Sequence, residues 1–273
     1  MRLGIGSWSY PWAIGVQGYP QPESPLSALG LLEKARAAGV GLVQIADNLP
    51  LDRLEAPELD RLRTGADALG VALEAGTRGV RPEHLARYLG IARFLGARLL
   101  RTLADTADLA QAEAWIREAL PEFAAAGVTI ALENYERHTA RDLARLVERL
   151  DSPWVGVCLD TVNSLGALET PRQVLEALAA HAVNLHVKDF DVVRVESGMG
   201  FAVVSRPAGE GRLEIPALLE RIGRYGREPS VILELWPPFT ETAQRTILLE
   251  EEWVKRSVQY LKPLLSAAGG AGA

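Results

Sequence analysis

Short apolar segments alternate with longer helical patterns along the whole chain, and this alternation restricts the fold more than any other feature. Eight segments have the length and apolar character of buried strands. Strands separated by helices form parallel sheets, because each crossover lays a helix against the sheet. The predicted strands are Arg2 to Ser7, Leu42 to Ala46, Val71 to Ala75, Ala97 to Thr102, Val128 to Glu133, Val155 to Asp160, Val183 to Lys188 and Val231 to Trp236.

Glycines mark the points where predicted helices end and the next strands begin. A residue at this position often adopts a left-handed conformation, which glycine reaches without a steric penalty. Eight such units without a break in composition predict an α/β fold, a single (β/α)8 TIM barrel with eight parallel strands over residues 1–265. A doubly wound open sheet is the alternative, but no Gly-rich phosphate loop follows the first strand. The glycines are Gly39, Gly70, Gly96 and Gly127.

Two segments do not fit the repeating unit. The residues at about 189–213 form a long, Gly-rich insertion before the next predicted helix, which suggests a lid over the barrel. The last residues, 266–273, are small, and we expect them to form a flexible tail.

Charge and composition exclude several classes of protein. The formal net charge is −6 and the sequence pI is about 5.4, which argues against a general affinity for nucleic acid. No apolar run approaches the roughly 20 residues that cross a bilayer. The N-terminus lacks the apolar core of a signal peptide, so we expect a cytoplasmic protein without a membrane partner. The single cysteine, Cys158, lies in an apolar run and is interpreted as a small core residue.

Four successive predicted strands end in side chains that bind metals. In TIM barrels the active site lies at the C-terminal ends of the strands. Buried carboxylates are costly unless a cation compensates them, so the four residues together favour one divalent metal ion. A mostly oxygen ligand set suits Mn²⁺ or Mg²⁺, with Co²⁺ or Zn²⁺ as alternatives. The predicted metal ligands are Glu133, Asp160, His186 and Glu234.

Other polar and aromatic side chains near the strand ends are candidates for substrate binding. Several are cations, which would suit a carboxylate or phosphate group. Each also has an ordinary structural explanation, such as a rim position or a surface ion pair. An aromatic ring can stack on the apolar face of a sugar, and amides can bind its hydroxyl groups. The candidates are Lys188, Arg194, Asn163, Trp8, Gln44, Arg78, Arg101 and Glu210.

The motifs around these strand ends resemble one known family. "LEN" at Glu133, "CLDTVN" at Asp160, "LHVKDF" at His186 and "LELW" at Glu234 are similar to the sugar phosphate isomerase/epimerase family with a xylose-isomerase-like TIM barrel. The resemblance implies that these four residues bind one divalent ion. It also implies that Glu133 and Glu234 form the catalytic acid–base pair. The epimerases have a histidine three residues after the aspartate, where this chain has Asn163.

The resemblance implies a metal-dependent enzyme that acts on a small keto sugar or sugar derivative, an isomerase or epimerase that passes through a metal-stabilised enediolate. The same metal site would also serve a lyase, either a decarboxylase of a 3-oxo sugar acid or a dehydratase. In each of these reactions the first step forms a negative charge that the metal must stabilise. A sugar-binding protein without catalysis is a third class. A homo-oligomer that pairs through the outer helices is compatible with the sequence.

Overall fold

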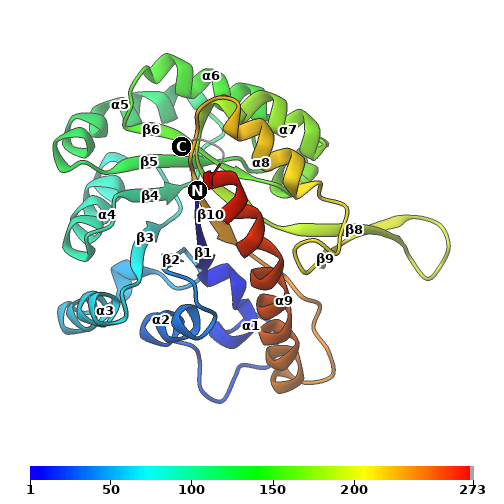
Figure 1. Ribbon diagram of the computed structural model, residues 1–273. Coiled ribbons are helices and arrows are strands. Elements are labelled where there is room, and N and C mark those ends of the chain that lie inside the picture. The colour runs from blue at the N-terminus through cyan, green and yellow to red at the C-terminus, as the bar shows by residue number, and fades with distance from the viewer. Residues whose placement is uncertain (271–273) are drawn as a thin grey trace.

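Eight parallel strands close into a barrel in the computed structural model, which describes residues 1–270 (Figure 1). Neighbouring strands follow the order β1-β10-β7-β6-β5-β4-β3-β2. All eight predicted strands are present within a few residues of their expected bounds, so the predicted TIM barrel is confirmed. They are β1 (Arg2–Gly6), β2 (Leu42–Ile45), β3 (Ala72–Gly76), β4 (Leu99–Thr102), β5 (Thr129–Glu133), β6 (Val155–Asp160), β7 (Ala182–Val187) and β10 (Ser230–Leu233).

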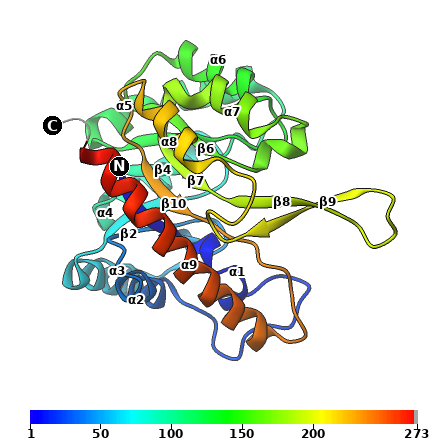
Figure 2. The ribbon, with the colours of Figure 1, turned by 45° about the vertical axis from the view of Figure 1, so that its right-hand side comes forward.

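Helices surround the barrel and cover its apolar outer face (Figures 1 and 2). Leucine, isoleucine and valine side chains from strands and helices form one continuous core between the two layers. None of the helices in residues 1–270 is long and apolar enough to cross a membrane. The helices are α1 (Pro11–Ile14), α2 (Ala28–Ala37), α3 (Ala56–Leu69), α4 (Pro82–Leu95), α5 (Leu109–Ala126), α6 (Ala140–Leu150), α7 (Pro171–Leu178), α8 (Ile215–Gly223) and α9 (Ala243–Gly270).

The four glycines expected at helix ends have the left-handed backbone that the sequence predicted. Their φ angles lie between 64° and 70°. A Cβ atom in this conformation would be strained, so glycine lets each helix turn directly into the next strand. This local geometry keeps the connections from these helices to the next strands short.

The insertion at about 189–213 forms an antiparallel hairpin of β8 (Asp189–Arg194) and β9 (Phe201–Arg206). The hairpin projects away from the barrel in both views (Figures 1 and 2). The buried Asp189 carboxylate fixes its base, because it accepts backbone N–H bonds from Gly209 and Gly211 at 2.8 and 3.0 Å. The predicted lid is therefore an anchored hairpin in this structure.

Helix α9 packs beside α1 and extends past residue 266, where the predicted tail begins. The buried Glu250 carboxylate on α9 accepts the backbone N–H groups of Trp12 and Ala13 at 2.8 and 3.0 Å, which ties α1 to α9. The backbone of α9 stays helical to Gly270, so the first part of the expected tail belongs to this helix. Residues 271–273 of the expected tail lie outside the described residues.

Candidate metal centre

The four predicted metal ligands meet inside the C-terminal end of the barrel. Glu133 and Asp160 are the last residues of β5 and β6, His186 lies near the end of β7, and Glu234 follows β10 directly. Side chains alternate along a strand, so these positions all face the barrel interior. All four are buried, and one ligand atom from each lies within 4.8 Å of the others.

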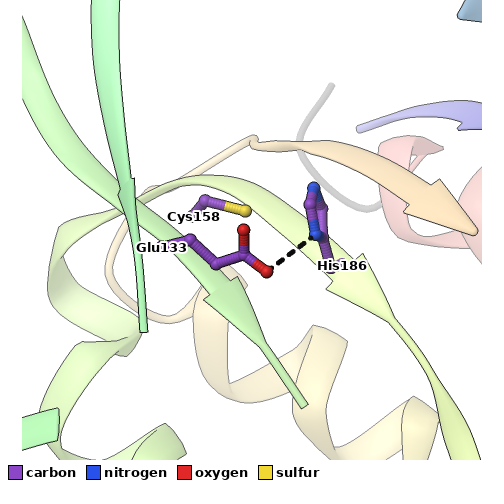
Figure 3. Close-up of side chains that lie close together, drawn as sticks. All are labelled: Glu133, Cys158 and His186. Atoms are coloured by element: carbon purple, nitrogen blue, oxygen red, sulfur yellow. Dashed lines mark ion pairs between the residues drawn. The ribbon is translucent and has the colours of Figure 1, made fainter. Parts of the chain in front are cut away.

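The ligand atoms converge on one point between the four side chains. His186 Nδ1 lies 3.3 Å from both Glu133 Oε1 and Glu234 Oε1, and 3.8 Å from Asp160 Oδ2. Figure 3 shows the Glu133 carboxylate directed at the His186 ring. Within residues 1–270, His186 Nδ1 and Glu234 Oε1 have no hydrogen-bond partner, which is rare for buried polar atoms. This cluster of three carboxylates and an imidazole can hold a divalent cation.

Two side-chain cations lie beside the cluster. Lys188 Nζ is 2.8 Å from Asp160 Oδ2 and 2.9 Å from Glu234 Oε2. Arg101 forms an ion pair through Nε with Glu133, and its Nη1 donates to Asp47 at 3.0 Å. Two cationic side chains therefore face three cluster carboxylates and Asp47. The excess of negative charge is a further reason why a divalent cation fits this site.

The charges of the cluster depend on one another. Burial disfavours the charged form of Glu133, but Arg101 and His186 outweigh burial and hold its pKa at about 2. Burial likewise opposes the charge on Glu234, yet His186 and Lys188 lower its pKa below the usual range. Burial raises the pKa of Asp160 despite the opposing effect of Lys188. Cationic neighbours thus keep the two glutamates ionised and ready to bind a metal.

Two asparagines orient the carboxylates from outside the cluster. Asn134 binds the backbone of Asp160 through both of its amide atoms, at 2.7 and 2.9 Å, and so joins the ends of β5 and β6. Asp160 Oδ1 accepts the backbone N–H groups of Val162 and Asn163, which leaves Oδ2 facing the cluster. Asn163 Nδ2 donates to Glu133 Oε1 at 2.8 Å. The motifs "LEN" and "CLDTVN" therefore hold each other in place.

Cys158 lies closer to this centre than the sequence suggested. It is two residues before Asp160 on β6 and faces the same interior, beside Glu133 and His186 (Figure 3). Burial raises the pKa of its thiol to about 12, which keeps it protonated. A protonated thiol is a poor ligand for a hard cation, so the oxygen-rich set is the better one. Cys158 also packs against Leu99 and Ala131, as expected for a core residue.

A pocket of about 380 Å³ lies over the cluster, in the size range of small-molecule sites. Three of its lining residues, Arg101, Asn163 and Lys188, also contact the cluster carboxylates. The lining combines cations, which can pair with an anionic group, with aromatic rings, which can stack on an apolar face. It consists of Trp8, Asp47, Arg78, Arg101, Leu103, Tyr135, Val162, Asn163, Lys188, Leu235 and Trp236.

Five of the eight predicted substrate contacts line this pocket, and the structure places three elsewhere. Gln44 is fully buried below the cluster, where its amide binds protein groups. Arg194 lies on the projecting hairpin, stacked on Phe201 at 4.6 Å. Glu210 forms a surface ion pair with Arg256 on α9, with its Oε1 2.8 Å from the guanidinium Nε. Their positions in the fold, which depend on long-range packing, separate them from the pocket.

Tyr135 and Trp236 also line the pocket, although neither is among the binding residues predicted from sequence. Each lies two residues after a predicted ligand, Glu133 or Glu234, so the alternation of strand side chains was a usable signal. Tyr135 also stacks under the guanidinium of Arg78, 4.8 Å from the ring centre. Together the two rings and Trp8 supply the apolar walls of the pocket.

The chain is similar to known proteins over nearly its whole length. The model of a family described as xylose isomerase-like TIM barrel matches residues 32–264. A 3-oxo-isoapionate decarboxylase from Pectobacterium atrosepticum is 37% identical over 265 residues, which cover 96% of this chain and 95% of that protein.

Solved structures with the same fold are more distant in sequence. A D-psicose 3-epimerase from Clostridium cellulolyticum, solved with D-tagatose, superposes with a TM-score of 0.73 at 16% identity, covering 97% of this chain and 99% of that one. A xylose isomerase-like TIM barrel protein from Mycobacterium smegmatis, in complex with magnesium, gives 0.72 at 14% identity, covering 98% and 97%. At this identity the likeness concerns the fold alone.

Proposed function

Because the chain belongs to the xylose isomerase-like TIM barrel family, we propose that it is a metal-dependent lyase that decarboxylates a 3-oxo sugar acid. The relative named as a 3-oxo-isoapionate decarboxylase supports this choice, since the two chains match over nearly their full lengths. The proposal follows the lyase alternative of the sequence analysis.

The unequal surroundings of the two glutamates carry the proposal. Arg101 and Asn163 both bind Glu133 and hold it as an anion, away from proton exchange. Glu234 instead pairs with Lys188, whose ammonium lines the pocket and carries protons. The site thus has one pair of side chains, Lys188 and Glu234, that can transfer a proton to one face of the substrate. Decarboxylation requires one proton, whereas epimerisation requires removal and return on opposite faces of the substrate.

The residues of the pocket can perform each part of the reaction. A divalent ion supplies electrophilic stabilisation of negative charge at the ketone oxygen when it is bound. Glu133, Asp160, His186 and Glu234 would hold that ion. The bond between the carboxylate and its neighbouring carbon breaks, carbon dioxide leaves, and the electron pair moves toward the ketone oxygen. The Lys188 ammonium, shared with Glu234, then gives one proton to that carbon and regains one from solvent.

Residues in the outer part of the pocket would orient the substrate. Arg78 is exposed at the rim and held by Tyr135, so its guanidinium can pair with the substrate carboxylate. Trp8 and Trp236 can cover the apolar face of the sugar and exclude water. Arg78 and Lys188 line the same pocket, so a substrate whose carboxylate pairs with Arg78 would share that space with the Lys188 ammonium.

The donor set supports a choice among divalent ions. Three carboxylates and one imidazole provide mostly oxygen ligands. Such a set suits Mn²⁺ or Mg²⁺ better than a soft metal ion that prefers cysteine thiolates. We therefore propose Mn²⁺ or Mg²⁺ as the cofactor, with Co²⁺ or Zn²⁺ as substitutes.

Epimerisation or isomerisation of a keto sugar is the second candidate. The observation in its favour is the symmetric placement of Glu133 and Glu234, each with Oε1 3.3 Å from His186 Nδ1. Such a pair could flank a substrate bound between them. Asn163 counts against this reading, because its amide cannot carry a proton.

A time course of NMR spectra in D₂O tests the proposal. The Mn²⁺-free, Mg²⁺-loaded protein would be mixed with 3-oxo sugar acids, keto sugars and keto sugar phosphates, with an EDTA-treated sample as the control. We expect loss of the carboxyl carbon from a 3-oxo sugar acid and deuterium at the carbon that it left. Deuterium beside the ketone of a keto sugar, with every carbon retained, would contradict the proposal and support epimerisation or isomerisation.

A further inference from the structure

A second layer of buried polar side chains lies directly below the metal centre. Gln44 on β2, Glu74 on β3 and Asn184 on β7 all face the barrel interior, and Gln44 and Asn184 are fully buried. Polar groups at this depth are costly unless each one is paired. Their contacts connect the base of the barrel to the imidazole of His186.

The contacts fix the orientation of the Gln44 amide. Its Nε2 donates to Glu74 Oε2 at 3.0 Å and to Asn184 Oδ1 at 3.2 Å. The Asn184 amide is set in turn, because its Nδ2 donates to Ser230 Oγ at 2.7 Å and to Glu74 Oε2 at 3.3 Å. With both Nε2 hydrogens used, Gln44 presents its Oε1 to His186.

The position of Gln44 Oε1 determines which nitrogen of His186 carries hydrogen. Oε1 lies 2.7 Å from His186 Nε2 and accepts only, so Nε2 must donate. A hydrogen fixed on Nε2 leaves Nδ1, which lies 3.3 Å from Glu133 Oε1 and Glu234 Oε1, as the ring nitrogen that can bind a cation. If Gln44 were reversed, its NH₂ group would favour hydrogen on Nδ1, which would block metal binding there.

We propose that Gln44 is a positioning residue of the metal centre, which holds His186 in the tautomer that binds a divalent cation through Nδ1. This inference rests on the metal site of the proposed function and does not depend on the substrate or the reaction. Groups that orient a metal-binding histidine in this way are worth about 10- to 100-fold in metal affinity.

Two substitutions separate the hydrogen bond from the packing. Gln44→Met keeps the length of the side chain and removes the acceptor. Gln44→Glu keeps an acceptor oxygen toward His186 and can share a proton with Glu74. Thr102→Val is the matched control, because Thr102 is a buried barrel residue that donates to the Gly79 carbonyl at 2.7 Å and does not contact His186.

Titration calorimetry with Mn²⁺ alone measures the expected effect without substrate. We expect the Gln44→Met protein to bind Mn²⁺ about 10- to 100-fold more weakly than the natural chain. The Gln44→Glu and Thr102→Val proteins should stay within a few-fold of it. Equal affinity in folded Gln44→Met protein would overturn the inference. If the natural chain bound no metal, the inference and the metal site would both fail, whereas binding without decarboxylation would refute only the proposed reaction.

Nitrogen-15 NMR of histidine-labelled, Mg²⁺-loaded protein reports the tautomer directly. The chain has four histidines, so the spectrum is simple to assign with the help of a His186→Ala sample. We expect a hydrogen on His186 Nε2 and none on Nδ1, and loss of this single form in Gln44→Met. A hydrogen on Nδ1 in the natural protein would overturn the inference.

Discussion

Replacement of Arg101 tests how strongly the cluster depends on its compensating cations. The Arg101 side chain is 5% exposed and the Glu133 side chain is fully buried. Arg101→Met would fill a similar volume but would leave Glu133 buried without its main ion pair, and Asp47 would lose its 3.0 Å partner. Removal of one member of a buried pair costs about 3–5 kcal/mol, because the other charge stays buried.

The expected loss is large enough for ordinary unfolding experiments. In a chain of this size, 1 kcal/mol lowers Tm by roughly 2–4 °C, so the metal-free Arg101→Met protein should melt roughly 6–20 °C below the natural protein. A bound divalent cation would replace part of the missing charge. The deficit should therefore shrink when Mg²⁺ is added in excess.

Urea unfolding with EDTA and with Mg²⁺ measures both effects. Arg98→Met is the matched control, because Arg98 precedes the same strand and is exposed. It should change the free energy of unfolding by less than about 0.5 kcal/mol. A loss in Arg101→Met as small as that of the control would refute the view that Arg101 compensates a buried carboxylate. If the loss in free energy of unfolding of Arg101→Met were the same with Mg²⁺ as with EDTA, the link to the metal site would be refuted.

Three further predictions concern catalysis and pH. Lys188→Met should lower kcat by about 10²- to 10⁴-fold in a carbon dioxide release assay, because the proton donor is lost. Glu133→Gln and Glu234→Gln should abolish turnover in the same assay, and full activity in both would remove their assigned roles. Burial raises the pKa of Glu250 to about 8, so the folded state keeps a proton that the unfolded state releases above 4.5. The free energy of unfolding should thus fall as pH rises from about 4.5 to 8, by at most about 1.4 kcal/mol per unit. Glu250→Gln should flatten this slope in urea titrations, and an unchanged slope would contradict the assignment.

The barrel and the clustering of the four candidate ligands could be predicted because both follow from local sequence. Apolar runs such as Val155–Asp160 are shorter than ordinary helices and are rich in β-branched residues, which favours strands. Once a parallel barrel is inferred, residues at strand ends such as Glu133 and Glu234 must come together at one rim. The distances between them in the structure follow from that geometry.

The roles of individual polar residues depended on packing that local sequence does not contain. Gln44 is part of a strand like the ligands, but it lies one layer deeper and meets His186, which is distant in sequence. The sequence of the insertion that carries Arg194 is compatible with a lid and with a projecting hairpin, since a glycine-rich turn occurs in either structure. Tyr135 and Trp236 could have been found by extending the strand alternation past the ligands.

Metal analysis of purified protein after equilibrium dialysis is the most direct test of the central claim, that four strand ends form one metal site. The natural chain should retain one Mn²⁺ per molecule, and Asp160→Ala and His186→Ala should each lose most of it while staying folded. Arg98→Met should retain the metal. Full occupancy in both ligand variants, or none in the natural chain, would contradict the account.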